Sequence, residues 1–481
     1  MSDRNEGSAP GRRGLIVENA GAVATLAGGL RRGAAQSDAG LIEAAAAGVG
    51  AAVDAGLAVA SWDGLIVAVG PAEDVHRRIE SAGHPVAEFE RVDAAGGLVT
   101  PGLIDAHTHL VFAGTRELEW QMRARGAGYL EVLAAGGGIL STVAATRAAS
   151  DADLLAGARG RLAEMLACGT TTAEAKSGYG LDTATELRQL AVIGRLDGEG
   201  PVELVPTFLG AHAVPAEFRA AAGDAPTAAE FRAAAGHATG AGHATGAGDA
   251  PTAADEYVSH VIHDQLPAVA RQGIARFCDV FCEDGVFSAA QTALILSAAG
   301  DLGLRFRIHA DELAPSGGAE LAAAIGCLSA DHLATPSEEG IVSLARAAEA
   351  GHPVVATLLP ATSWFLGKHH FAPARRYIEA GIPVALATDL NPGTSPTVSL
   401  PLVMSIACVE MGLNPAEALA AVTINAAHSV GLGDRIGSIE PGKQADLVVW
   451  SVTTLEQLPY WLGTRPARTV VKRGRVVFER D

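Results

Sequence analysis

The chain contains 481 residues and carries a formal net charge of −19, with 49% apolar and 19% charged residues. This length exceeds one ordinary domain, and the composition is typical of a globular protein that buries a large core. The acidic balance disfavours nucleic acids and anionic membrane surfaces as partners.

Features along the chain favour the cytoplasm. The first seven residues lack the apolar core of a signal peptide. The longest uncharged stretch, 390–409, contains three prolines and does not resemble a membrane helix. The five cysteines lie scattered through apolar segments, which favours free thiols in a reducing compartment. We therefore expect a cytoplasmic protein that does not insert into a membrane.

The N-terminal region 14–95 contains short β-like runs at 14–17, 57–60 and 65–69. We predict a disordered tail at 1–13 before them. An Ala/Gly-rich tract at 29–56 favours an extended loop or a poor helix. These runs are expected to form the first part of a small β-domain.

An apolar β-like run at 97–105 leads into two histidines one residue apart, His107 and His109. Side chains two residues apart on a strand point to one face, so both imidazoles can bind one metal ion from the same side. Alone, this spacing is weak evidence, because solvated loop histidines share it. Its interpretation depends on the residues that follow.

Eight β-rich runs alternate with helical runs between 96 and 432. The runs end at His107, Lys176, Leu209, Glu283, His309, His332, Leu358 and Asp389. Helices are predicted at 151–167, 183–196, 289–302, 318–325 and 336–350, the first with Ser150 as its N-cap. This α/β pattern predicts a (β/α)8 TIM-like barrel, whose active site lies at the C-terminal ends of its strands.

The C-terminal region 433–481 contains further β-like runs at 445–450 and 469–478. We expect them to pair with the N-terminal runs into a small β-sandwich domain built from both termini. Within the barrel region, residues 220–255 carry an internal duplication. We interpret it as a low-complexity inserted loop rather than a metal-binding tract.

Polar residues at the strand ends predict a mononuclear metal site. In the strand before His309, Phe306 and Ile308 alternate onto one face, so His309 projects to the other. Asp389 ends the last predicted strand. The alternatives are a hydrogen-bonded core histidine and an aspartate that caps the next helix. A catalytic metal site keeps an open position for water and lowers the pKa of that water from about 15.7 towards about 7.

Proton transfer has two candidate residues. Glu312 lies three residues after His309 and is the first candidate for the general acid/base. His332 ends another predicted strand and is also suited to orient or activate water, with Asp331 beside it as a structural partner. The sequence leaves open which of the two is the main base.

Five segments together carry a specific resemblance. They are PGLIDAHTH at 101–109, KSGYG at 176–180, LGAH at 209–212, HADE at 309–312 and TDLNPG at 388–393. From about residue 97 to the C-terminus the chain resembles the imidazolonepropionase family of the metal-dependent amidohydrolase superfamily. It departs from the usual family pattern in the 220–255 insert and in the longer Ala-rich N-terminal region.

The resemblance implies an enzyme of L-histidine degradation that hydrolyses the cyclic amide 4-imidazolone-5-propanoate to N-formimino-L-glutamate. It implies one Zn²⁺ or Fe³⁺ per chain held by His107, His109, His309 and Asp389. It also implies substrate contacts from Arg116, Tyr179, His212, Glu312, Asn391, Gly393 and Thr394. Family analogy and the base rate for soluble enzymes favour a homodimer.

Each implied substrate contact has a physical reason. Arg116 can grip the propionate with a bidentate fork, although a surface pair with Glu117 or Glu119 is the alternative. Tyr179 and His212 offer donors for substrate oxygens. Asn391 and the Gly393 backbone can bond the amide-like edge of the ring, although Asn-Pro-Gly is also an ordinary turn. Lys176 is interpreted as a structural or electrostatic group, because the family uses one metal.

Two other functions remain open from the sequence. A deaminase of purines or pyrimidines would keep the metal and Glu312, but would not need an arginine for an aliphatic carboxylate. The effect of Arg116→Ala on substrate choice separates the two reactions. A non-catalytic relative that uses the barrel as a scaffold is expected to lose metal ligands, and this chain retains all four.

Overall fold

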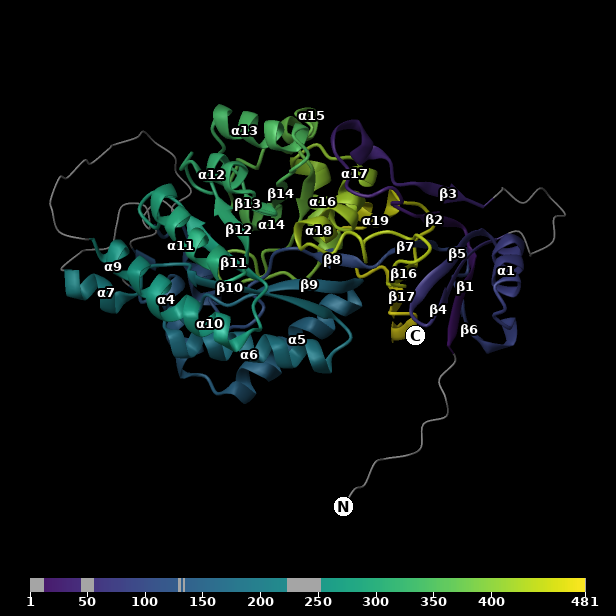
Figure 1. Cartoon of the computed structure of the whole chain (residues 1–481), viewed down its shortest axis with the longest axis horizontal. Coiled ribbons are helices and arrows are strands. Elements are labelled where there is room, and N and C mark those ends of the chain that lie inside the picture. The colour runs from purple at the N-terminus through teal and green to yellow at the C-terminus, as the bar shows by residue number, and fades with distance from the viewer. Residues whose placement is uncertain (1–12, 45–55, 129–130, 133–134, 223–251, 481) are drawn as a thin grey trace, which may run out of the picture.

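The computed structural model describes residues 13–44, 56–128, 131–132, 135–222 and 252–480. Figure 1 shows a large unit with strands β8 to β14 at its centre and a smaller unit, built from strands near both termini, beside it. Residues 1–12 of the predicted tail and most of the 220–255 insert lie outside the described residues. None of the described helices combines the length and the apolar composition needed to cross a bilayer.

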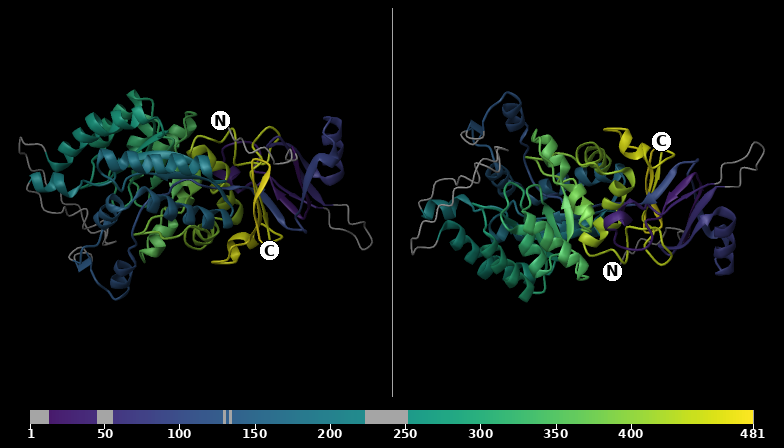
Figure 2. Two further views of the ribbon diagram at one scale, coloured as in Figure 1. Left: turned by 90° about the horizontal axis from the view of Figure 1, so that it is seen from below. Right: turned by 90° about the horizontal axis from the view of Figure 1, so that it is seen from above.

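One sheet of eight strands forms the predicted barrel. Its neighbouring strands pair in parallel in the order β8 to β15, and Figure 2 shows helices arranged around them. The strands are β8 (Leu103–Asp105), β9 (Thr170–Lys176), β10 (Glu203–Ala211), β11 (Phe277–Cys282), β12 (Arg305–Ala310), β13 (Ser329–His332), β14 (Val355–Leu358) and β15 (Val384–Leu386). The prediction of a (β/α)8 barrel is confirmed.

Strands β8 and β15 are the two ends of this pairing order, and they meet just beyond their last residues. Thr108 and Leu390 form a parallel bridge there. The carboxylate of Asp105 accepts hydrogen bonds from the backbone N–H of Thr388 at 3.0 Å and from its hydroxyl at 2.6 Å. This seam brings the segment after the first barrel strand against the segment after the last one.

The helices of the barrel region follow the predicted pattern. They are α2 (Glu117–Ala124), α4 (Ile139–Ala148), α5 (Asp151–Ala167), α6 (Thr183–Glu199), α7 (Ala216–Ala222), α9 (Ala253–His260), α10 (Leu266–Gln272), α11 (Ala289–Asp301), α12 (Gly318–Ile325), α13 (Glu338–Glu349), α14 (Pro360–Phe365), α15 (Ala374–Glu379), α16 (Leu400–Glu410), α17 (Pro415–Ala421) and α18 (Ile424–Ser429). Helices α5 and α12 begin and end at the predicted residues. Ser150 caps α5, because its side chain accepts the N–H of Asp153 and the Asp153 carboxylate accepts the N–H of Ser150.

Two sheets form the smaller unit, one in the order β5-β4-β1-β6 and one in the order β18-β17-β16-β7-β2-β3. Their strands are β1 (Gly14–Ala20), β2 (Ala22–Ala24), β3 (Leu41–Glu43), β4 (Leu57–Trp62), β5 (Leu65–Pro71), β6 (Phe89–Asp93), β7 (Leu98–Pro101), β16 (Leu447–Trp450), β17 (Ala467–Lys472) and β18 (Arg475–Glu479). Side chains from both sheets, among them Leu15, Val59, Val99 and Val449, share one buried core. This is the predicted sandwich with strands from both termini.

The outer face of the first sheet is covered by α1 (Ala72–Ser81). Ile16 alternates with its neighbour Leu15 and packs with Val75 and Ile79 of this helix. In the second sheet, Trp450 bonds the hydroxyl of Thr100 at 2.9 Å through its indole N–H. That bond joins a C-terminal strand to the strand that enters the barrel. Helix α19 (Gln457–Tyr460) lies between β16 and β17 along the chain.

Two predicted strands are divided in the structure. The run at 97–105 splits at Gly102 into β7 of the sandwich and β8 of the barrel, and a Cβ on Gly102 would lie 2.3 Å from Thr171 Oγ1. The run at 469–478 folds into a hairpin at Arg473 and Gly474, whose φ angles are 51° and 69°. An apolar pattern that continues across a break does not reveal a change of sheet or direction.

The described part of the Ala/Gly-rich tract is more ordered than predicted. It contains a 3-10 turn, Gly33–Ser37, and strand β3. The buried side chain of Gln36 donates to the carbonyl of Val384 and accepts its N–H, both at 3.2 Å. The tract therefore satisfies backbone groups of the last barrel strand.

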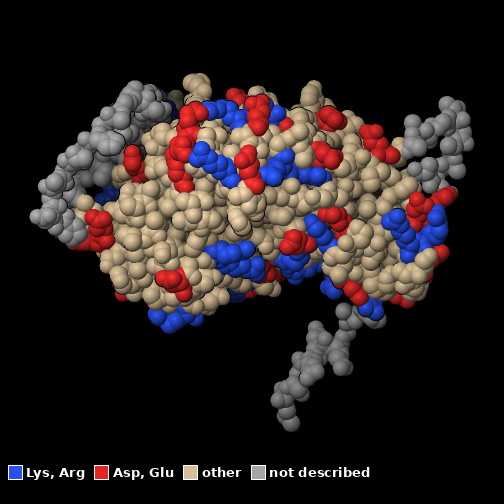
Figure 3. Space-filling view, turned by 45° about the horizontal axis from the view of Figure 1, so that its top comes forward, with Lys and Arg blue, Asp and Glu red and all other residues tan. Residues whose placement is uncertain are grey.

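Charge is spread over the surface in small groups. Figure 3 shows basic and acidic side chains close together on the face that it presents, among larger uncharged areas. On that face no single sign of charge forms a continuous field.

Candidate active site

A cavity of about 230 Å³ opens at the C-terminal ends of the barrel strands. Enzymes with this fold place their active sites at the same end. Most predicted site residues line the cavity: His109, Arg116, Tyr179, His212, His309, Glu312, His332, Asp389, Asn391 and Thr394. His107 is fully buried beside it, and Gly393 packs behind Arg116.

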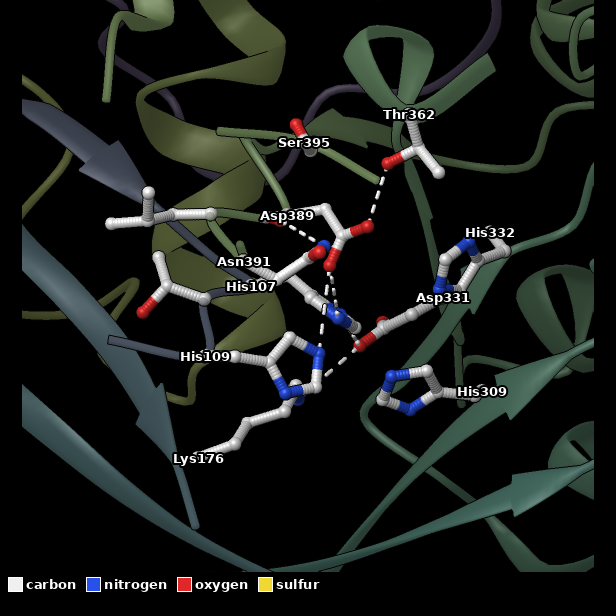
Figure 4. Close-up of polar contacts among 12 residues, drawn as sticks. His107, His109, Lys176, His309, Asp331, His332, Thr362, Asp389, Asn391 and Ser395 are labelled. Atoms are coloured by element: carbon white, nitrogen blue, oxygen red, sulfur yellow. Dashed lines mark hydrogen bonds and ion pairs between the residues drawn. The ribbon is translucent and has the colours of Figure 1, made fainter. Parts of the chain in front are cut away.

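The predicted metal ligands converge at the floor of this cavity (Figure 4). The Nε2 atoms of His107 and His109 each lie 3.5 Å from Asp389 Oδ1. The ring of His309 lies 4.6 Å from the ring of His107, measured between centroids. His332 is also near, because one of its ring nitrogens lies within 4.8 Å of a ring nitrogen of His107 and of one of His309. The structure therefore brings together side chains from four different strand ends.

Neighbouring carboxylates bind the Nδ1 atoms of His107 and His309 and so fix the orientation of both rings. His107 Nδ1 lies 2.6 Å from Asp331 Oδ2, and His309 Nδ1 lies 3.0 Å from Asp279 Oδ1. A carboxylate accepts, so each Nδ1 carries a proton, and in a neutral ring the lone pair is then on Nε2, the atom available to a metal ion. These two Nε2 atoms are buried without a hydrogen-bond partner in the described structure. Ligand histidines have this arrangement, so the side chains fit a metal ion.

A buried ion network supports these histidines. Lys176 Nζ lies 2.8 Å from Glu174 Oε1 and 2.7 Å from Asp279 Oδ2, and Arg307 Nη2 lies 2.9 Å from Asp331 Oδ2. Although burial lowers the pKa of Lys176, the two carboxylates raise it above its usual value. The lysine therefore stays protonated, in agreement with its interpretation as an electrostatic group.

Asp389 is held in a constrained loop. Its φ is 53°, and its Oδ2 accepts the hydroxyl of Thr362 at 2.6 Å. Burial raises the pKa of its carboxyl to about 7. A non-glycine residue in this backbone region is uncommon and often marks a functional site. A bound cation would favour the ionised form and lower this pKa.

The Asn391 turn differs from the predicted contact. Asn391 Oδ1 accepts the N–H of Gly393 at 2.9 Å and of Thr394 at 2.8 Å, and its amide donates to the Asp389 carbonyl at 2.7 Å. The Gly393 N–H is thus engaged inside the turn rather than free for the substrate ring. Asn391 and Thr394 still face the cavity, and their main visible role is to shape its wall beside Asp389.

Glu312 and His332 face each other across the cavity floor. Glu312 Oε2 lies 3.6 Å from His332 Nδ1. Burial lowers the pKa of His332 to about 4, so the imidazole is neutral at pH 7. Burial alone would raise the pKa of Glu312, but the neighbouring His332 imidazole and the Lys368 ammonium group bring it below its usual value. Glu312 is therefore the ionised member of the pair, which suits a base.

The loop with Tyr179 is anchored by a residue that the sequence did not single out. Glu186 is buried and accepts three backbone N–H groups of the segment 178–181 at 2.8 to 2.9 Å. The Gly178 carbonyl in turn accepts His212 Nδ1–H at 2.9 Å. Burial lowers the pKa of His212 to about 3, so its Nε2 carries no proton. Towards the cavity, His212 is an acceptor rather than the predicted donor.

The sequence left open whether Arg116 faces the substrate or pairs with a nearby glutamate, and in the structure it does both: it pairs with Glu119 and lines the cavity. Its Nε and Nη2 bind both oxygens of Glu119, at 2.8 and 2.7 Å, and the residue also lines the cavity. A second arginine, Arg123 of helix α2, contacts the same carboxylate at 3.2 Å and lines the cavity too. The structure thus adds Glu119 and Arg123 to the predicted wall.

The amidohydrolase family matches residues 98–477 of the chain. An imidazolonepropionase from Geobacillus kaustophilus is 50% identical over 415 residues, which cover 86% of this chain and 88% of that protein. The chain belongs to the imidazolonepropionase family. A relative with the same name from Symbiobacterium thermophilum is 44% identical and covers 97% of each chain.

The fold of this imidazolonepropionase family member is shared more widely. An adenosine deaminase from Xanthomonas campestris, solved with bound zinc, has a TM-score of 0.59 and 22% identity, and covers 97% of this chain and 93% of that one. At this identity the similarity concerns the fold alone. Because the structural match covers 97% of this chain, the shared fold includes the terminal sandwich as well as the barrel. The family also implies a metal cofactor.

Sequence reasoning missed buried charged residues behind the candidate ligands of this imidazolonepropionase family member. These residues are Glu174, Asp279 and Arg307. One signal was available, since each is charged and lies within a predicted barrel strand. Such residues are almost never fully buried unless they are paired. Which histidine each one supports depends on strand register, which the sequence does not show.

Proposed function

We propose that the protein hydrolyses 4-imidazolone-5-propanoate to N-formimino-L-glutamate in L-histidine degradation. The observation that carries the proposal is one cavity with a histidine and carboxylate floor and three arginines, Arg116, Arg123 and Arg219, in its wall. The floor suits hydrolysis of a cyclic amide, and the arginines suit a substrate with a carboxylate side chain. The identity of 50% to a curated imidazolonepropionase supports the same reaction.

The proposed cofactor is one Zn²⁺ or Fe³⁺, held by His107, His109, His309 and Asp389. The unpartnered Nε2 atoms of His107 and His309 support this set, and its nitrogen and oxygen donors suit either metal. When bound, such an ion polarises a carbonyl and makes water a nucleophile at neutral pH. Asp279 and Asp331 hold the rings of His309 and His107, and although burial opposes it, the charge of Asp279 raises the pKa of His309.

Glu312 is proposed to move the proton. Hydrolysis adds water to the ring carbonyl carbon, breaks the bond from that carbon to the ring nitrogen and leaves a carboxylate. As the ionised group, Glu312 takes a proton from the attacking water and delivers it to the departing nitrogen. Neutral His332, 3.6 Å from Glu312, orients the water and helps to hold Glu312 in place.

The remaining wall residues are proposed to position the substrate. Arg116 donates to the propionate carboxylate with the N–H groups that Glu119 does not use. His212 accepts a ring N–H through Nε2, and Tyr179 donates its hydroxyl. Burial raises the pKa of that hydroxyl well above its usual range, so it keeps its proton. Asn391 and Thr394 complete the wall beside the ring.

The test is a spectrophotometric assay with freshly generated 4-imidazolone-5-propanoate on metal-analysed wild type, Arg116→Ala and Arg125→Ala. Arg125 is exposed at the end of the same helix and serves as the matched control. We expect substrate absorbance to fall with wild type and Arg125→Ala, and about one metal per chain. Arg116→Ala should lose about 10- to 100-fold in kcat/KM. Metal-replete wild type without turnover would refute this substrate.

The cytoplasmic location and the homodimer stay predictions of the sequence. Size-exclusion chromatography with light scattering measures the second directly.

A further inference from the structure

The Glu119 carboxylate is saturated with donors. Its Oε1 accepts Arg116 Nε–H at 2.8 Å and the backbone N–H of Gly138 at 2.9 Å. Its Oε2 accepts Arg116 Nη2–H at 2.7 Å and Arg123 Nη2–H at 3.2 Å. A carboxylate offers about four acceptor positions, so Glu119 has no position left for a further ligand. Its side chain is 8% exposed.

This arrangement fixes the direction of Arg116. Glu119 occupies the edge of the planar guanidinium group that Nε and Nη2 form. The N–H groups that remain unused, on Nη1 and Nη2, therefore point away from Glu119. Arg116 Nη1 packs against Gly393, where a Cβ would lie 1.8 Å away. Arg123 Nη1 donates to the Gly393 carbonyl at 3.3 Å. Both arginines therefore lie against the turn that follows Asp389.

The cluster has a surplus of positive charge at the cavity wall. Two guanidinium groups share one carboxylate, and the described ion pairs give neither arginine a second acidic partner. Burial, followed by the charge of Arg116, lowers the pKa of Arg123. Side chains of Arg116 and Arg123 remain 12% and 22% exposed, and both line the cavity. A surplus charge that faces a cavity attracts an anion.

We propose that Arg123 is a second specificity-determining residue that binds the substrate carboxylate with Arg116, and that Glu119 is the positioning residue for both arginines. The inference rests on the proposed function and adds two residues to it. It implies that selection of a carboxylate side chain depends on a preassembled pair of arginines rather than on Arg116 alone. Preassembly reduces the ordering cost of binding.

The test compares the acid substrate with its neutral propionamide analogue, in which only the carboxylate is replaced. We measure kcat and KM for both with Arg123→Gln and with Arg125→Gln, the exposed control on the same helix. Arg123→Gln should lower the acid-to-amide ratio of kcat/KM about tenfold or more, mainly through KM for the acid. Arg125→Gln should leave the ratio unchanged.

Two outcomes would overturn the role of Arg123. Equal losses on acid and amide would show that Arg123 acts on helix α2 structurally. An unchanged ratio in Arg123→Gln, with a lower ratio in Arg219→Gln, would assign the carboxylate to Arg219, which lines the same cavity and donates to the Val214 carbonyl at 3.0 Å. Wild type that turns over neither substrate would refute the proposed function itself, so the two failures are distinguishable.

Glu119→Gln tests whether Glu119 positions the two arginines, because the two explanations predict opposite changes in KM for the acid substrate. The substitution removes a negative charge, so local charge alone predicts a lower KM for the acid substrate. Loss of the bidentate contact instead predicts misaligned arginines and a higher KM for the acid, with the amide substrate little affected. We expect the second result. A lower KM for the acid would refute positioning by Glu119.

Discussion

The two ends of the cavity are built in different ways. At the histidine end, the side chains follow barrel strands, and those of His107, His109 and Asp389 are 0%, 3% and 3% exposed. At the arginine end, Arg116 and Arg123 belong to helix α2 and the loop before it and are 12% and 22% exposed. Both ends use carboxylates to orient their functional side chains.

Under the proposed function, this difference separates the residues that carry the reaction from those that select the substrate. A metal site requires several donors at fixed distances, which the strand ends of a barrel supply. A carboxylate subsite needs two or three donors, which a short helix can present and evolution can replace without disturbing the barrel. We therefore expect changes at the histidine end to reduce kcat and changes at the arginine end to raise KM.

The largest effect is expected from His309→Ala, which removes a proposed ligand. Loss of metal removes several kcal/mol of transition-state stabilisation, so kcat/KM should fall by about 10³-fold or more. Metal content and activity are measured together, with His260→Ala, a histidine of helix α9 that pairs with Asp264, as the control. A variant that retains full metal and activity would contradict our placement of the reacting end.

Asp279→Asn tests the support behind that ligand. The amide no longer provides a charged acceptor for His309 Nδ1–H, so metal affinity or activity should fall about 10- to 100-fold. Metal titration and thermal unfolding are measured beside Asp284→Asn, an exposed acid after the same strand. If Asp279→Asn keeps wild-type metal affinity, the buried network does not serve the histidine end.

Gly393→Ala is expected to displace the Arg116 side chain without removing any charge. Its new Cβ would collide with Arg116 Nη1 and Cζ, so the guanidinium must turn away. We expect KM to rise about tenfold, as part of a charge-assisted hydrogen bond is lost, while kcat stays near wild type. Gly160→Ala, in helix α5 with nothing within 4 Å of the added Cβ, is the control. A fall in kcat instead of a rise in KM would contradict our assignment of substrate binding to the arginine end.

The smallest effect is expected from Lys368→Met, on the pH profile. Lys368 lowers the pKa of Glu312, so its removal raises that pKa. The acidic limb of kcat/KM, where Glu312 becomes protonated, should therefore move to higher pH by less than about 1 unit. Lys368→Arg keeps the charge and should keep the limb in place. A shift to lower pH would show that another group forms this limb.

The sequence predicts the barrel and the floor of the cavity well, because both follow local patterns. Apolar strands that end in a polar residue identify His309 and Asp389 without knowledge of the neighbouring strands. The wall is less predictable. Arg116 and Glu119 are three residues apart, so their pair is foreseeable, but the direction of the remaining N–H groups depends on Gly393, far along the chain.

Tertiary hydrogen bonds account for the other differences. The donor or acceptor role of His212 depends on the Gly178 carbonyl, which belongs to a neighbouring loop. The break at Gly102 depends on Thr171 of the adjacent strand. In both places the deciding neighbour is distant or on another element, so no periodicity in the local sequence carries the information.

The seam of the barrel also bears on how the chain assembles. Asp105 and Thr388, which join its two edges, are 283 residues apart. During synthesis the first two histidines emerge long before the final strand, and contacts of such long range form late. The complete proposed ligand set therefore exists only after the last barrel strand has docked. A nascent or truncated chain that ends before β15 has part of the proposed donor set and lacks its geometry, so under our proposal metal binding requires the completed fold.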